Sequence, residues 1–166
     1  MKLKKLVSAV TALSVVAALC ASLSGCGEKK SDKYKVGICQ LAQHDALDAS
    51  TQGFKDALKE KLGDKVTFDE QNAAGEPATC TTIVNQFVSG KVDLIFANAT
   101  GALQAAVSAT DSIPIVGTSV TDYATALEMK DWSGKTGINV TGTSDLAPLD
   151  KQAEMFKELL PNAKKV

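Results

Sequence analysis

Short apolar runs alternate with amphipathic segments along the chain from residue 34 onward. The apolar runs lie at residues 35–40, 66–70, 92–96 and 113–117, and residues 137–142 are extended and predict a fifth strand or a crossover. In the segments between these runs, apolar residues recur at helical spacing. Strands that alternate with helices are typical of a parallel sheet wrapped in helices. The pattern therefore predicts an α/β fold with a doubly wound, mostly parallel sheet.

The ends of the first two helices carry specific sequence signals. One helix is expected from about Asp45, where Asp45 and Asp48 are placed for N-capping, and Gly63 closes it. A second helix opens at Pro77 and stops at Gly90. Each helix follows a predicted strand, so the first half of the domain consists of two β-α units.

Three further positions shape the second half of the chain. Thr100 is placed to cap a short helix, and Pro148 begins a last one. Pro114 removes a backbone donor, so its strand should lie near an edge of the sheet or begin its pairing late. Residues 164–166 look like the entry to another strand that does not follow, and we expect the chain to be truncated.

The N-terminus carries a lysine-flanked, charge-free apolar stretch over residues 6–23, followed by Ser24-Gly25-Cys26. Lysines favour the cytoplasmic face while the apolar run partitions into the bilayer. The ending matches the lipobox of bacterial lipoproteins, in which the cysteine thiol is acylated. It predicts a signal peptide over residues 1–25, a lipid on Cys26, and an extracytoplasmic, membrane-anchored protein. A permanent transmembrane helix is the less favoured alternative, because the stretch is barely long enough and is interrupted by hydroxyl residues.

Composition narrows the chemistry of the remaining chain. The net charge of -1 gives no electrostatic footprint for nucleic acid. All 18 basic residues are lysine, so an anionic ligand group must be held without a guanidinium. Cys39 and Cys80 can either pair as a disulfide or remain buried thiols. With His44 as the single histidine and no Cys-x-x-Cys spacing, neither a structural zinc site nor another cofactor is indicated.

Polar side chains gather where the predicted strands end. Ligands of open parallel sheets bind at the carboxyl ends of the strands. The candidate residues there are Gln40, His44, Asn98, Thr100, Thr118, Ser119, Thr121 and Asp122. Hydroxyls, amides and a carboxylate suit a small zwitterionic or polyol ligand. The alternative interpretation of Asp45 and Thr100 is that they serve only as helix caps.

Several segments, in their order and spacing, carry a family resemblance. They are Val36-Gly37-Ile38, His44-Asp45-Ala46-Leu47-Asp48 with Gly53-Phe54, Gln71-Asn72-Ala73, Asp93-Leu94-Ile95, Ile113-Pro114-Ile115-Val116, Val120-Thr121-Asp122 and Asn139-Val140-Thr141-Gly142-Thr143-Ser144-Asp145. Together they resemble the ABC-transporter substrate-binding lipoproteins of the aromatic-amino-acid (tryptophan or tyrosine) type. Two positions depart from that pattern, because Asp45 and Tyr123 stand where the family usually has proline.

The resemblance implies a type I periplasmic-binding-protein fold, in which two α/β lobes close over a ligand and present it to a membrane permease. On this basis residues 26–33 are a flexible tether and residues 34–140 are the N-terminal ligand-binding lobe. Residues 141–166 are then the hinge crossing and the first helix of a second lobe that is largely missing.

The resemblance also suggests how an amino acid would be held. Its carboxylate would take backbone N–H groups and hydroxyls near Thr100 and Ser119, where a helix N-terminus favours an anion. Its ammonium group would pair with Asp122 or Asp145. The aromatic residues nearby, Tyr123 and Trp132, are either packing residues or a stacking platform.

Two other functions remain open. A ligand-sensing lipoprotein would present the same small molecule to a signalling receptor instead of a permease. An enzyme on a flavodoxin-like scaffold is less favoured, because the chain has no Gly-x-Ser-x-Gly elbow, no phosphate loop and one imidazole for acid-base work. We therefore expect a binding protein and no enzyme.

Overall fold

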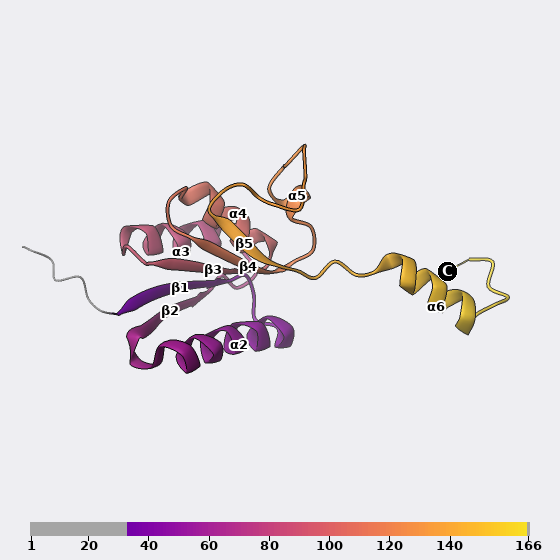
Figure 1. Ribbon diagram of the computed structural model, residues 1–166, viewed down its shortest axis with the longest axis horizontal. Coiled ribbons are helices and arrows are strands. Elements are labelled where there is room, and N and C mark those ends of the chain that lie inside the picture. The colour runs from indigo at the N-terminus through magenta and orange to yellow at the C-terminus, as the bar shows by residue number, and fades with distance from the viewer. Residues whose placement is uncertain (1–32, 166) are drawn as a thin grey trace, which may run out of the picture. The chain divides into compact units, whose positions relative to one another are not determined.

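In the computed structural model, which describes residues 33–165, a five-stranded sheet forms the centre of the fold. All of its strand pairs are parallel, in the order β2-β1-β3-β4-β5 (Figure 1). The strands are β1 (Tyr34–Gln40), β2 (Val66–Asn72), β3 (Leu94–Asn98), β4 (Ile115–Val120) and β5 (Val140–Ser144). The predicted α/β fold with a parallel sheet is confirmed. The predicted signal peptide, Cys26 and all but the last residue of the tether lie outside the described residues.

The helices cover both faces of this sheet. The described helices are α2 (Asp45–Leu62), α3 (Pro77–Ser89), α4 (Thr100–Ala109), α5 (Tyr123–Ala126) and α6 (Leu149–Leu159), with a short 3-10 turn η1 (Gly63–Lys65) after α2. Of these, α2, α3 and α4 pack on the sheet. Figure 1 shows α2 on one face and α3 and α4 on the other. The chain thus winds to opposite sides of the sheet after β1 and after β2, as a doubly wound fold requires.

Alternate residues of each strand supply the two halves of the core. On the side of α3 and α4, Phe87 and Leu103 pack into one cluster with Cys39 and Ile95 of the sheet. On the side of α2, Val36, Ile38 and Phe96 are buried, and the Phe54 ring stacks on Phe96 with centroids 3.9 Å apart. This two-sided burial explains why the inner strands β1 and β3 are rich in apolar residues, whereas the outer strands β2 and β5 are mostly polar.

The two described cysteines lie in the larger cluster as free, fully buried thiols. Burial raises the pKa of Cys39 and the pKa of Cys80 above the ordinary thiol value. The neighbouring Cys80 raises the pKa of Cys39 further, through its charge and through a hydrogen bond between the two thiols. Of the two states that the sequence allowed, this structure has the unpaired one.

Two helix starts differ from the predicted caps. His44, and not Asp45, is the N-cap of α2, because its backbone is extended and its Nδ1 accepts the Ala46 N–H at 3.2 Å. Ala99, and not Thr100, is the N-cap of α4. The Ala99 N–H still donates to the Thr118 carbonyl at 3.0 Å, so strand pairing extends through Ala99 and Thr100 becomes the first helical residue.

The strands are displaced along the chain from their predicted positions. β3 begins at Leu94 because the Val92 N–H is still bound to the Phe87 carbonyl at the end of α3. β4 begins directly after Pro114 and lies between β3 and β5. Of the two predicted alternatives, late pairing after Pro114 is therefore confirmed; β4 is not itself an edge strand, but it is the neighbour of the outer strand β5.

The last helix, α6, begins after Pro148 as predicted, and its apolar residues stay exposed. Leu149 and Leu159 are the most exposed large apolar side chains in residues 33–165, and Phe156 is exposed as well. Within that same range, no helix combines the length and the apolar character needed to cross a membrane.

Candidate ligand-binding site

Strand register brings the predicted polar residues to one edge of the sheet. Gln40 of β1 lies opposite Asn98 of β3, and Asn98 lies opposite Thr118 of β4. Thr100 follows β3 at this edge, and the loop after β4 follows there too, with Thr121 and Asp122. Parallel strands place all their carboxyl ends together, which is why residues far apart in the sequence meet here.

At the ends of β1 and β3, the polar side chains are buried in a network with α2. The Thr51 hydroxyl donates to Gln40 Oε1 at 2.6 Å and accepts from Asn98 Nδ2 at 3.0 Å. Gln40 Nε2 donates to Asp48 Oδ1 at 2.5 Å, and Asn98 Nδ2 also donates to the Leu47 carbonyl at 2.8 Å. Gln40 and Asn98 are only 5% and 0% exposed. Their side chains therefore join α2 to the sheet, and we refer to this part as the β1–β3 edge.

Thr51 is a member of this network that was missed from the sequence. It is 2% exposed and lies four residues after Leu47 and three before Phe54, on the buried side of α2. A hydroxyl in an apolar helix stripe needs a partner when it is buried. A threonine on the apolar side of this helix was therefore the sequence signal that could have revealed the network.

The Asn98 amide has a fixed orientation. Its Nδ2 lies against two acceptors, since the Thr51 hydrogen is used by Gln40. Its Oδ1 is buried and is the one such side-chain atom without a hydrogen-bond partner among the described residues. This oxygen can therefore accept a hydrogen bond from an N–H or O–H donor.

At the ends of β4 and β5, in contrast, polar groups face outward. The β4–β5 register shifts between Gly117 and Val120, and Ser119 there has a φ of 55°. Asp122 is exposed and caps α5, where its Oδ1 accepts the Ala124 N–H at 3.0 Å. We refer to this part as the β4–β5 edge.

The Asp122 carboxylate is held in its charged form. Its Oδ2 accepts the Thr125 hydroxyl at 2.6 Å. This hydrogen bond is the main cause of a lowered pKa of Asp122, and the backbone N–H groups of Ala124 and Thr125 lower it further. Asp122 is therefore an anion at neutral pH that a ligand ammonium group can approach from solvent.

Asp145 lies at the β4–β5 edge, whereas His44 follows β1. The Asp145 backbone N–H donates to the Val120 carbonyl at 3.2 Å, which places this second exposed carboxylate beside the loop after β4. His44 is exposed at the start of α2, and half of its ring hydrogen-bonding capacity is committed to the helix cap. Thr118 is half-buried, and its hydroxyl lies 3.0 Å from that of Thr143.

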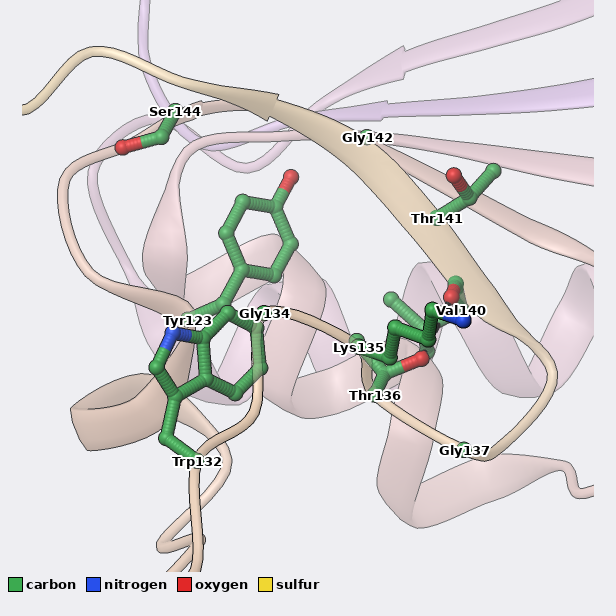
Figure 2. A pocket seen from close by; sticks show the side chains of 10 residues that line it. All are labelled: Tyr123, Trp132, Gly134, Lys135, Thr136, Gly137, Val140, Thr141, Gly142 and Ser144. Carbon is green, nitrogen blue, oxygen red and sulfur yellow. Dashed lines mark hydrogen bonds between the residues drawn. The ribbon is translucent and has the colours of Figure 1, made fainter.

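A groove of about 370 Å³ lies beside β5 (Figure 2). Its wall includes Tyr123, Trp132, Lys135, Thr141 and Ser144. None of the nine ligand-binding candidates lines it. Tyr123 is 7% exposed and is a packing residue, whereas Trp132 from the loop before β5 is 43% exposed.

A parallel α/β lobe with polar groups at the carboxyl ends of its strands can hold a small ligand at that edge. Two solute-binding proteins from Thermotoga species, each 16% identical to the chain, share this type I periplasmic-binding-protein fold. Residues 35–166 match the family of ABC transporter substrate binding proteins. The chain therefore belongs to this family.

Three relatives show what the chain is similar to. A tyrosine-binding protein of Clostridioides difficile (strain R20291) is 44% identical over 144 residues, which cover 83% of this chain and 41% of the relative. The ligand-free, open structure of a substrate-binding protein with adhesive properties from Clostridium difficile is 43% identical, with a TM-score of 0.71, and the match covers 79% and 45% of the two chains. A Streptococcus pneumoniae structure in complex with L-Trp is 36% identical with a TM-score of 0.71, over 78% and 44%. The chain thus spans less than half the length of each.

Proposed function

We propose that the chain is the ligand-binding lobe of an extracytoplasmic lipoprotein that captures an aromatic amino acid and delivers it to an ABC permease. The family match over residues 35–166 carries this proposal. The choice of ligand is supported by two relatives, one described as binding tyrosine and one solved with L-Trp. Catalysis is not part of the proposal, because the family is one of binding proteins.

The ligand's carboxylate is proposed to bind at the start of α4. The N–H groups of Thr100 and Gly101 have no acceptor within their own helix, and the helix dipole makes that end positive. The Thr100 and Ser119 hydroxyls add donors nearby. A helix N-terminus of this kind serves where an arginine is absent, as it is throughout this sequence.

The ligand's ammonium group is proposed to pair with Asp122, because this carboxylate is exposed and has a lowered pKa. Asp145 is the second carboxylate within the same edge. The aromatic ring needs apolar walls, which the family's two-lobed architecture supplies when the lobes close over the ligand. One lobe alone should therefore bind weakly.

Membrane attachment is proposed through a lipid on Cys26, with residues 26–33 as a tether that leaves the lobe mobile above the membrane. The partners are then the permease subunits of the transporter. The intact mass of the protein from the membrane fraction tests this attachment, and an unmodified thiol on Cys26 would contradict it.

Calorimetric titration of the natural full-length protein with tyrosine, tryptophan, phenylalanine and leucine tests the function. We expect binding of at least one aromatic amino acid and a weaker response to leucine. Asp122→Asn can keep the bond from the Ala124 N–H but loses the charge and one of the two accepted bonds. Affinity should therefore fall about tenfold or more, while thermal stability falls only slightly.

The matched control is Asp56→Asn, since Asp56 is an exposed carboxylate that accepts one side-chain bond from Gln52 on α2. It should bind like the unaltered protein. Unchanged affinity in Asp122→Asn together with a loss in Asp145→Asn would move the ammonium site to Asp145. Turnover of any of these ligands, or the absence of binding to all of them, would contradict the proposed function.

A further inference from the structure

We propose that Ser144 is a positioning residue that joins the ligand loop after β4 to the end of β5, so that the two segments move as one unit. The ligand loop is here defined as residues 118–122, which are the irregular end of β4 and the two residues after it; the end of β5 is defined as residues 143–146, which include the two residues after that strand. The inference rests on the proposed function, because that function gives the loop its ligand contacts. The Ser144 hydroxyl donates to the Thr121 carbonyl at 2.7 Å and accepts the Leu146 N–H at 3.2 Å. One exposed hydroxyl thus holds both segments.

Neighbouring bonds extend this connection along both segments. The Asp145 N–H donates to the Val120 carbonyl at 3.2 Å, and the Thr118 and Thr143 hydroxyls lie 3.0 Å apart. The regular β4–β5 pairing is interrupted between Gly117 and Val120 and resumes where Val120 pairs with Ser144. Side-chain hydrogen bonds therefore connect β4 and β5 where the backbone hydrogen bonds between these strands are irregular.

Tyr123 supports the same region from below. Its hydroxyl donates to the Thr143 carbonyl at 3.3 Å, and its ring packs against Gly117 and Gly142. A Cβ on Gly117 would lie 2.5 Å from that hydroxyl. This space admits only glycine, so the Tyr123 side chain lies close against the backbone of both β4 and β5. Figure 2 shows the Tyr123 side chain reaching from α5 toward β5, whose last residue is Ser144.

The consequence concerns how ligand binding is transmitted. The loop carries Ser119 and Asp122, which are the proposed ligand contacts, while the end of β5 leads directly into the segment before α6. A ligand that orders the loop should order residues 144–146 as well. Without the Ser144 hydroxyl, the loop should still bind the ligand, but binding should no longer order residues 144–146.

Hydrogen exchange of the natural full-length protein, resolved by residue, tests this inference. In Ser144→Ala without ligand, the amides of Asp145 and Leu146 should exchange about fivefold to tenfold faster. Asp145 is the decisive amide, because its acceptor on Val120 is chemically unchanged. Ser144→Thr keeps the hydroxyl and should restore slow exchange. Ser108→Ala removes a similar exposed hydroxyl bond within α4 and should leave residues 143–146 unaffected.

Tyrosine is then added to the same variants. In the unaltered protein it should slow exchange in both the loop and residues 144–146; in Ser144→Ala it should slow exchange only in the loop. Protection confined to the loop of the unaltered protein, or identical responses in Ser144→Ala, would overturn the inference. If calorimetry shows no binding to the unaltered protein, the proposed function fails, and the ligand-free exchange of Asp145 still decides the inference.

Discussion

The β1–β3 edge and the β4–β5 edge both lie at the carboxyl ends of their strands, but polar side chains are buried at the first edge and exposed at the second. At the β1–β3 edge, Gln40 and Asn98 are buried and bonded to Thr51. At the β4–β5 edge, Asp122 and Ser144 are exposed and hold their segments through surface hydrogen bonds. The rule that ligands bind at carboxyl ends of parallel strands selects both edges equally, so it does not distinguish a ligand contact from a structural amide.

Coverage by neighbouring elements accounts for the difference. β1 and β3 are central strands, with α2 packed on one face and α3 and α4 on the other. A polar side chain that ends such a strand must find partners inside the protein. β5 is an outer strand of the sheet, and its last residues are open to solvent. The comparison therefore supports a stabilising role for Gln40 and Asn98 at the first edge, and it supports the proposal that Asp122 at the second edge receives the ligand's ammonium group.

Gly142→Ala should have the largest effect on stability, because it disturbs the packing of Tyr123 beneath the β4–β5 edge. A Cβ there would collide with the Tyr123 hydroxyl and with the Gly117 backbone. We expect a loss of about 2–3 kcal/mol in the free energy of unfolding, measured by urea denaturation. Gly53→Ala on α2 is the matched control, since nothing lies within 4 Å of its added Cβ. It should stabilise the protein slightly, and equal stability of both variants would contradict the packing described for Tyr123.

Thr51→Val tests the buried edge directly. The substitution keeps the shape of the side chain but leaves Gln40 Oε1 without its donor and Asn98 Nδ2 with one acceptor fewer. The free energy of unfolding should fall by about 1–2 kcal/mol. Thr82→Val on α3 is the control, because its hydroxyl bond to the Ala78 carbonyl is exposed. A Thr51→Val protein as stable as the Thr82→Val protein would show that the network contributes nothing.

The sequence predicted the order of the elements better than it predicted their ends. Apolar runs and punctuating residues located β1 to β4 and the helices α2, α3, α4 and α6, because burial on both faces of a parallel sheet requires such runs. The short helix α5 was not predicted, and β5 was left open between a strand and a crossover. The cap at Thr100 was wrong because pairing of Ala99 with Thr118 is a long-range contact that local pattern does not contain.

The sequence predicted which loops form the candidate site, but not which of their side chains face solvent. Register followed from the parallel fold, and it placed Gln40, Asn98 and Thr118 in one row. Whether each side chain faces solvent depends on which helix covers the strand end, and Thr51 lies 11 residues from Gln40 and 47 from Asn98. The separation of a buried edge from an exposed one therefore required the three-dimensional structure.

Tyr123→Phe should have the smallest effect at neutral pH, about 0.5–1 kcal/mol, because the ring stays in place and only the bond to the Thr143 carbonyl is lost. Its clearer signature is alkaline. Burial, and then the Asp145 charge, raises the pKa of Tyr123 above the ordinary value of 10.0. Above about pH 10 the unfolded tyrosine loses its proton while the folded one keeps it, so this residue's contribution to stability falls as pH rises.

Urea denaturation from pH 8 to about pH 11 measures this difference. The buried thiols of Cys39 and Cys80 also weaken the fold in alkali, but they do so equally in both proteins. Tyr123→Phe should therefore lose stability less steeply than the unaltered protein above about pH 10, and Tyr34→Phe, at an exposed ring, should follow the unaltered protein. Parallel curves for all three would mean that the Tyr123 hydroxyl is not held at the β4–β5 edge, and the support beneath the ligand loop would then be the ring alone.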